Sequence, residues 1–293
     1  MFQSFAWNHI AAQAFADREV PFVVYAESDQ GAALVPTAID QARNRLVFLG
    51  ETLFDYRDVL CWGDPQVLAS AWNRASQLGM KFSSGALRSD SNFSVWNGFD
   101  VSRFYGAPRV SPKEITADLF AQGHNRLASW KRRLDREGVE FKCHTGSNSE
   151  LVRYIYEQKG AQPSEIGGSL FSDPRRVQFM VEICRQMGSA CEIFTFESAG
   201  TLVAALVTFR DRHVRRFYTI YFDQAWAKHS PGMVLLYEVT CRSLKAGLEC
   251  DYMTGEHSYK TRFATSIVPM YWVEATADAL ANLGKTEQWP MAA

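Results

Sequence analysis

A short polar run late in the chain gathers the side chains best suited to proton transfer. Glu256, His257 and Tyr259 stand close together, directly after a predicted strand that ends in Gly255. Glu256 and His257 are candidate general bases, because a carboxylate accepts a proton and an imidazole titrates near neutral pH. Tyr259 is a candidate acid for a leaving group. The run predicts a site of proton transfer, although a surface histidine and a packed tyrosine would give the same pattern.

Basic side chains near this run suit an anionic partner. Lys260 and Arg262 belong to the same polar segment, and Arg126 lies on a predicted basic helix from Gly123 to Glu137. Such side chains bind the phosphate or carboxylate of a substrate, although solvated surface charge is equally common. Asp223, at the end of an earlier strand, is a candidate for positioning an acceptor or, alternatively, for capping its own backbone.

A second candidate site lies where a strand leads into a helix through a turn of small residues. The strand is the aromatic and β-branched run from Arg216 to Asp223, and the helix is predicted from Met233 to Gly247. Between them, we expect Ser230 to cap the helix and Pro231 to occupy its first turn. Backbone N–H groups at such a helix start converge on an anion such as a phosphate, whereas a plain strand–loop–helix connection is the alternative. The residues predicted to bind this anion are Tyr221, Lys228, His229, Ser230, Pro231, Gly232 and Met233.

The order strand, turn, helix, strand and polar loop resembles the cofactor-binding half of the GNAT acyltransferases. The pattern is most similar to the branch associated with cellulose and exopolysaccharide biosynthesis (CelD/BcsL-type, FemAB-related). That branch carries a Tyr-Asp-x-x-Trp/Tyr-Ala-x-x-Ser-Pro-Gly run, an Asp-x-x-x-Gly strand end and a Tyr-Lys pair. The matching residues here are Tyr221 to Asp223, Trp226 and Ala227, Ser230 to Gly232, Asp251 to Gly255, and Tyr259 with Lys260. The resemblance extends from Ile115 to Phe263, but the glycine-rich pyrophosphate loop of better-known GNAT enzymes is reduced to Lys228–Gly232.

This resemblance implies an α+β fold and an acyl-transfer reaction. The expected fold is a tandem of GNAT-like halves, each a mostly antiparallel mixed sheet flanked by helices. The expected activity (EC 2.3.1) moves an acetyl or other acyl group from acetyl-CoA or another acyl-CoA to an amine or hydroxyl of a small molecule or sugar, in exopolysaccharide or cellulose biosynthesis. Such a reaction must deprotonate the acceptor, hold an oxyanion and protonate a thiolate. Glu256, His257, Tyr259 and Asp223 are therefore the predicted catalytic residues.

Composition limits the other classes of function. The chain has 293 residues, 47% of them hydrophobic, and a net charge of −1, which argues against a nucleic-acid coat or a polybasic membrane anchor. Six cysteines without a Cys-x-x-Cys pair predict reduced thiols in a soluble cytoplasmic protein. We expect no signal peptide, membrane span or DNA partner. The isolated histidines lack metal-ligand spacing, and hydrolase, ATPase and dehydrogenase fingerprints are missing, so no metal is expected.

The chain is predicted to divide into residues 1–111, a degenerate GNAT-like half, and residues 112–293, the acyltransferase half. The elements expected in the first are a helix over Phe5–Ala16, a hairpin of Pro21–Ala26 and Ala32–Ile39, strands at Arg45–Leu49 and Met80–Ser83, and a helix over Pro65–Leu78. Residues 88–112, rich in Ser, Asn, Gly and Pro, are expected to form an irregular connection. The elements expected in the second are helices at Pro112–Phe120, Gly123–Glu137, Ser149–Lys159 and Pro174–Met187, and strands at Val139–His144, Cys191–Glu197, Leu202–Phe209, Val214–Tyr221, Glu249–Gly255 and Ile267–Ala275.

Two other functions remain open at this point. A FemAB-like aminoacyl transferase would take its donor from aminoacyl-tRNA, against which the near-neutral charge weighs, because tRNA binding draws on many phosphate contacts. A GNAT-like domain that binds a nucleotide or partner without catalysis would explain the reduced glycine-rich loop. The sequence names neither the acceptor nor the acyl chain.

Overall fold

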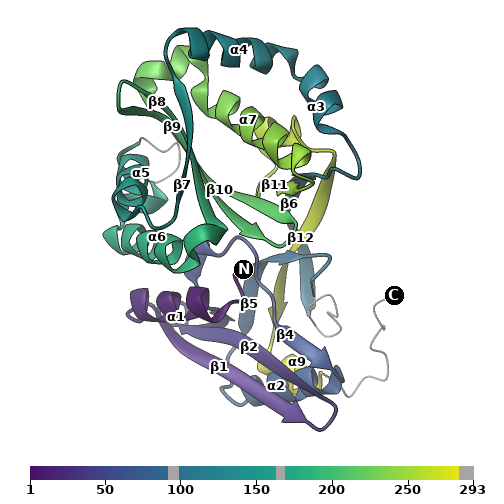
Figure 1. Ribbon diagram of the computed structural model, residues 1–293. Helices are drawn as coiled ribbons and strands as arrows, with labels where there is room; N and C mark the ends of the chain where they lie inside the picture. The colour runs from purple at the N-terminus through teal and green to yellow at the C-terminus, as the bar shows by residue number, and fades with distance from the viewer. Residues whose placement is uncertain (92–98, 163–168, 284–293) are drawn as a thin grey trace. The chain divides into compact units, whose positions relative to one another are not determined.

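The computed structural model describes residues 1–91, 99–162 and 169–283 (Figure 1). The chain forms two compact units: residues 1–106 with the segment that begins at Val268, and residues 107–267. The division predicted at 111/112 assigned the segment from Val268 to the second half. Its contacts group it with the first unit instead, because β12 (Ser266–Ala275) pairs antiparallel with β5 (Phe82–Arg88).

The first unit is a mixed sheet with the strand order β1-β2-β3-β5-β12, and β4 pairs with β2. Its other elements are α1 (Phe5–Ala14), β1 (Glu19–Ser28), β2 (Gly31–Asp40), β3 (Arg45–Phe48), β4 (Leu60–Gly63), α2 (Gln66–Ser76) and α9 (Ala277–Asn282). The predicted hairpin and the two predicted helices are confirmed, and β5 begins at Phe82, within the predicted strand, but continues to Arg88. Strand β4 and helix α9 were not expected. Trp72 of α2 packs edge-on against Phe82, with ring centroids 4.9 Å apart, in the core of this unit.

Part of the predicted connection is a strand. β6 (Asp100–Val110) carries the chain from the first unit into the second, so the expectation of irregular structure across residues 88–112 is wrong for this part; residues 92–98 lie outside the described residues. Proline is rare within a sheet because it has no N–H to donate, so Pro108 argued against a strand here. In the structure, Pro108 takes part in the sheet through its carbonyl, which accepts a hydrogen bond of 2.9 Å from the Tyr252 N–H.

The second unit is a mostly antiparallel sheet with helices on both faces (Figure 1). From the end of β6, the strand order is β6-β11-β10-β9-β8-β7. The strands and helices are α3 (Ala117–Gly123), α4 (Asn125–Arg136), β7 (Glu140–Thr145), α5 (Ser149–Ala161), α6 (Pro174–Met187), β8 (Cys191–Ser198), β9 (Thr201–Asp211), β10 (Val214–Phe222), α7 (Pro231–Lys245), β11 (Glu249–Asp251) and α8 (Ser258–Thr261). Helices α3, α4 and α7 cover one face, and α5 and α6 cover the other.

Local signals placed most of these elements well. Strands β8, β9 and β10 pair antiparallel as predicted. Asp173 caps α6 by accepting from the Arg175 N–H at 3.0 Å, and Pro174 occupies the first position of that helix. None of the described helices is long and apolar enough to cross a membrane.

Two local predictions are wrong. Ser230 makes no capping hydrogen bond with its side chain, because its backbone adopts a left-handed conformation with φ of 47°. Pro231 nevertheless begins α7 as expected. The strand predicted to end at Gly255 instead ends at Asp251, and Met253 has a positive φ of 63° that takes the chain out of the sheet.

Candidate functional site

The centre of the second unit is a place where two parallel strands separate. Residues 214–216 of β10 pair with residues 249–251 of β11, and there β11 ends. Strand β10 continues to Phe222, with a bulge between Phe217 and Thr219 in its pairing with β9. Beyond Arg216, no strand in the described part of the chain pairs with the β10 edge that faces away from β9. Its backbone groups are therefore available to a ligand.

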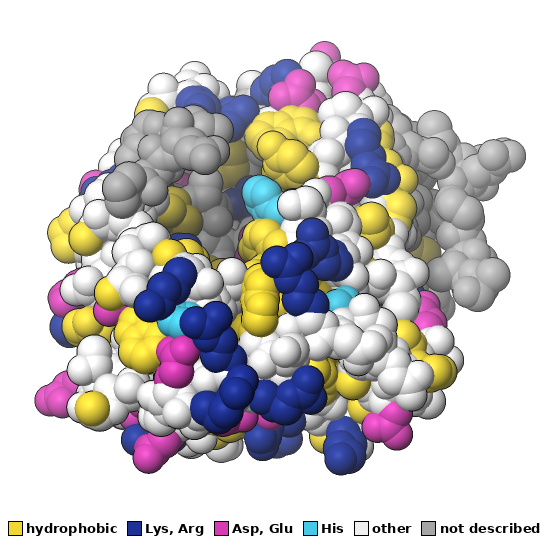
Figure 2. Space-filling model, turned by 90° about the horizontal axis from the view of Figure 1, so that it is seen from above, with side chains coloured by type: hydrophobic (Ala, Val, Ile, Leu, Met, Phe, Trp, Pro, Cys, Tyr) yellow, Lys and Arg dark blue, Asp and Glu magenta, His cyan; other side chains and the backbone are white. Residues whose placement is uncertain are grey.

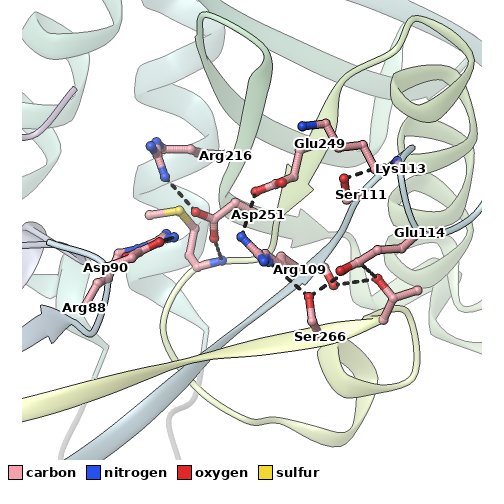
Figure 3. Close-up of polar contacts among 12 residues, drawn as sticks. Arg88, Asp90, Arg109, Ser111, Lys113, Glu114, Arg216, Glu249, Asp251 and Ser266 are labelled. Carbon is pink, nitrogen blue, oxygen red and sulfur yellow. Dashed lines mark hydrogen bonds and ion pairs between the residues drawn. The ribbon is translucent and has the colours of Figure 1, made fainter. Parts of the chain in front are cut away.

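Asp251 fixes the point at which the strands separate. One carboxylate oxygen accepts a hydrogen bond of 2.7 Å from the Arg216 guanidinium, and the other accepts one of 2.9 Å from the Met253 N–H (Figure 3). Asp251 is 2% exposed, so this is a buried ion pair that also holds the left-handed turn at Met253. The same carboxylate thus ties the end of β11 to β10 and starts the loop that follows.

A second set of polar contacts ties β11 to β6 and to the segment after α8 (Figure 3). Arg109 of β6 lies 3.8 Å from a carboxylate oxygen of Glu249 and donates from Nε to Ser266 Oγ at 3.0 Å. Ser266 and Thr265 in turn donate to the carboxylate of Glu114. Both ends of the loop that contains α8 are therefore anchored.

We expect Asp251→Asn to lower the free energy of unfolding by about 1.5–3 kcal/mol, because it removes the nearer charged partner of the Arg216 guanidinium and leaves the longer contact with Asp211, at 3.6 Å. Asp135→Asn is a matched control, since Asp135 pairs with Lys131 on the exposed surface of α4 and should lose less than about 1 kcal/mol. Urea unfolding followed by circular dichroism measures both changes. Equal losses in the two variants would contradict the anchoring role of Asp251.

Two cavities lie on opposite faces of the sheet at the separation. The smaller, of about 50 Å³, is on the α7 face and is lined by Leu206, Phe217, Tyr218, Ile220, Leu236, Tyr252, Tyr259 and Lys260. The larger, of about 400 Å³, is on the α5 face and is lined by Lys159, Gln162, Ser169, Leu170, Phe171, Tyr218, Thr219, Ile220 and Tyr259. Tyr218, Ile220 and Tyr259 line both cavities, so the two cavities adjoin at the open edge of β10.

After the bulge in β10, successive side chains lie on opposite faces of the sheet. Ile220 and Phe222 belong to the core beneath α7. Thr219 points to the other face, where its hydroxyl oxygen accepts a hydrogen bond of 3.1 Å from the buried Tyr156 of α5. Gln162, just after α5, donates to the Phe222 carbonyl at 3.1 Å. These contacts hold the wall of the larger cavity against the edge of β10.

Of the four predicted catalytic residues, Tyr259 lies at the junction of the cavities. The His257 ring stacks on the Tyr259 ring, with centroids 5.9 Å apart and planes 11° apart. His257 and Glu256 are exposed on the loop before α8. Asp223 accepts from the Ala225 N–H at 2.9 Å, which is the backbone-capping role that the sequence left open.

The turn predicted to bind an anion leads directly into α7. The first helical hydrogen bond is from the Val234 N–H to the Ser230 carbonyl, and in the described part of the chain the N–H groups of Gly232 and Met233 have no acceptor. A Cβ added at Gly232 would lie 3.3 Å from Phe222 and 3.4 Å from Ile220, so the helix start packs closely on the open part of β10.

The remaining residues predicted for the anion site differ in their surroundings. Lys228 is exposed. His229 is buried, with Nε2 3.3 Å from a carboxylate oxygen of Glu137, so it contacts the end of α4. Tyr221 lies on the α5 face, where burial, then Tyr154 and Asp223, raise its pKa to about 12. The backbone N–H groups of Gly232 and Met233, with Lys228 nearby in sequence, therefore stay the candidates for binding an anion.

The predicted substrate-binding cations lie in different places. Lys260 donates to the Thr254 carbonyl at 2.6 Å and lines the smaller cavity. Arg262 is exposed, and Arg126 lies over the Trp130 ring, 4.7 Å from its centroid. Lysine and arginine side chains gather on the face of the molecule drawn in Figure 2. The sequence analysis missed Lys159, which lines the larger cavity. A lysine near the end of an amphipathic helix resembles ordinary surface charge, and the sequence held no signal of its burial.

Comparison with known proteins agrees with this geometry. Residues 121–261 match the family model of the acetyltransferase (GNAT) domain. A solved tandem GNAT protein from the clavulanic acid biosynthesis pathway superposes with a TM-score of 0.52 at 9% identity, covering 92% of this chain and 87% of that one. The chain has the GNAT fold. The matched residues fall inside the span from Ile115 to Phe263 that the sequence predicted.

Other solved structures share this GNAT architecture along nearly the whole chain. FemX superposes with a TM-score of 0.61 at 8% identity and covers 98% of this chain and 94% of its own. The C-terminal DUF2156 domain of a protein assigned as a lysylphosphatidylglycerol synthetase in Agrobacterium fabrum gives 0.60 at 12% identity, with 94% of each chain covered. No curated protein sequence matches the chain. The cellulose-associated branch therefore stays a prediction.

Proposed function

We propose that this protein is a GNAT acyltransferase that moves an acyl group from acyl-CoA to an amine or hydroxyl of a small molecule or sugar. One observation carries the proposal. The parallel pairing of β10 and β11 ends at Arg216 and Asp251, and the cavities on the two faces of the sheet meet at the open edge of β10. Donor and acceptor can thus approach the same backbone segment from opposite faces.

The start of α7 suits the pyrophosphate of the donor. A helix of 15 residues carries a partial positive charge at its N-terminus, and Gly232 and Met233 offer two N–H donors there. Gly232 packs on Ile220, and Ile220 lines both cavities. When CoA is bound at this helix start, its thioester arm can extend along the open edge of β10.

In the proposed reaction, the acceptor nitrogen or oxygen attacks the thioester carbonyl carbon. The carbonyl oxygen becomes an oxyanion, and backbone N–H groups of the open β10 edge stabilise it. When the carbon–sulfur bond breaks, Tyr259 gives its phenolic proton to the thiolate and is reprotonated from solvent. The proton lost by the acceptor passes to a base, for which Glu256 and His257 remain the candidates. The products are the acylated acceptor and free CoA thiol.

We expect acetyl-CoA or a longer acyl-CoA to raise the melting temperature and to be consumed with release of free thiol when an acceptor is present. A panel of acyl-CoAs tested by thermal shift, with thiol release followed by a chromogenic disulfide reagent, measures both effects. Desulfo-CoA, which lacks the thiol, separates binding from chemistry. Binding without thiol release from any thioester would favour the non-catalytic GNAT-like domain. Stabilisation by aminoacyl-tRNA alone would favour the FemAB-like aminoacyl transferase.

A further inference from the structure

The larger cavity has the size and lining of a small-molecule site. Its volume of about 400 Å³ lies within the ~300–1,000 Å³ common for ligand pockets. Leu170, Phe171 and Ile220 form an apolar wall, while Gln162, Thr219 and Tyr259 add polar groups. Thr219 accepts from Tyr156, which leaves its own hydroxyl proton available to a ligand.

Lys159 is the charged residue that distinguishes this cavity. It lies near the end of α5, and no acidic side chain is among the described residues that line the cavity. In the described part of the chain its ammonium group has no hydrogen bond or ion pair. Burial lowers its pKa, because the charged form loses contact with water. A half-buried ammonium with no partner among the described residues is costly unless an anion compensates for the lost water.

Three other lysines of the same unit have partners within the chain. Lys142 pairs with Glu197 at 2.8 Å, Lys131 pairs with Asp135, and Lys260 donates to the Thr254 carbonyl at 2.6 Å. Lys159 differs from them because its ammonium lines a cavity large enough for a molecule. A ligand with an anionic group would supply the partner that Lys159 lacks among the described residues.

We infer that the larger cavity binds the acceptor and that Lys159 pairs with an anionic group of that acceptor, a carboxylate or a phosphate. This inference rests on the proposed acyl transfer, because it assigns the α5 face to the acceptor and the α7 face to the donor. The acceptor class is thus an amine or hydroxyl compound with an acidic group, such as an amino acid or an amino-sugar phosphate. Lys159 acts as a specificity-determining residue, and the reacting atom points toward Tyr259 at the other wall.

The test uses matched acceptors that differ in one charge: phenylalanine with phenylalaninamide, and glucosamine 6-phosphate with glucosamine. The parent protein should favour the anionic member of at least one pair, and the pair that responds distinguishes a carboxylate from a phosphate. Lys159→Met should raise KM for that anionic acceptor about 10- to 100-fold, the range for one hydrogen bond to a charged group. It should leave kcat, the neutral acceptor and acetyl-CoA affinity nearly unchanged.

Two further variants separate charge from shape. Lys159→Arg should retain most of the preference for the anionic acceptor, and Lys245→Met, at an exposed lysine of α7, should behave like the parent. Equal use of charged and neutral acceptors by the parent and Lys159→Met would overturn the inference while the proposed acyl transfer stands. If no acyl-CoA releases thiol, saturation-transfer NMR with the same four compounds still tests whether the anionic compounds bind and whether their binding depends on Lys159. Binding of the anionic members that Lys159→Met does not weaken would also overturn it.

Discussion

Replacing Tyr259 with phenylalanine should lower the rate of thiol release from acetyl-CoA by about 10²–10⁴-fold, the usual contribution of a positioned general acid. The reason is positional: Tyr259 lines both cavities at the point where they meet, so its hydroxyl can reach a thiolate leaving the open edge of β10. The phenyl ring keeps the stacking with His257. Affinity for acetyl-CoA, measured by calorimetry, should therefore change little while kcat falls.

Companion variants separate the acid from the base. Tyr105→Phe removes a hydroxyl from an exposed ring outside the site and should leave turnover unchanged. Glu256→Gln and His257→Ala, made separately, test which residue deprotonates the acceptor, because loss of the base should abolish the lower limb of the pH–rate profile. Near-parental turnover in Tyr259→Phe would remove the tyrosine from the mechanism. Unchanged pH profiles in both base variants would make this loop a structural element.

Much of the fold follows from signals that act within a few residues. Asp173 and Pro174 start α6 where the sequence predicted, because a cap and a fixed φ need no distant partner. The short turns between β8, β9 and β10 likewise force antiparallel pairing. Pro231 likewise begins α7 as predicted, although Ser230 contributes its backbone carbonyl rather than its hydroxyl.

The features that make the site depend on residues far apart in the sequence. The end of β11 is set by Asp251, whose partner Arg216 lies 35 residues away. The position of Lys159 in a cavity depends on β10 and on the segment after residue 168, and nothing near Lys159 in sequence reports that burial. Periodicity and capping carry no information about such contacts. The sequence therefore predicted the loop that carries Tyr259 but not the cavities that Tyr259 joins.

Met233→Glu should weaken binding of acetyl-CoA about 10- to 100-fold. A carboxylate in the first turn of α7 would lie near the pyrophosphate proposed to bind there, and two like charges about 5 Å apart repel by about 1–3 kcal/mol at a partly exposed site. Met233 is a better position for this test than Gly232, where any side chain would press on Phe222 and Ile220 and disturb the packing of the helix on β10.

The charge of the same carboxylate should not destabilise the fold. A loss of acetyl-CoA affinity in Met233→Glu can therefore be distinguished from a loss caused by unfolding. An acidic side chain near a helix N-terminus stabilises the helix by about 0.3–1 kcal/mol. Met233→Gln is the matched control, because it loses the same apolar contact with the α7 core without adding charge. Calorimetry should show that Met233→Glu binds acetyl-CoA more weakly than Met233→Gln does. This difference in affinity should become smaller as the salt concentration rises, because salt screens the repulsion. Equal affinities for the two variants at low salt would mean that the pyrophosphate binds elsewhere.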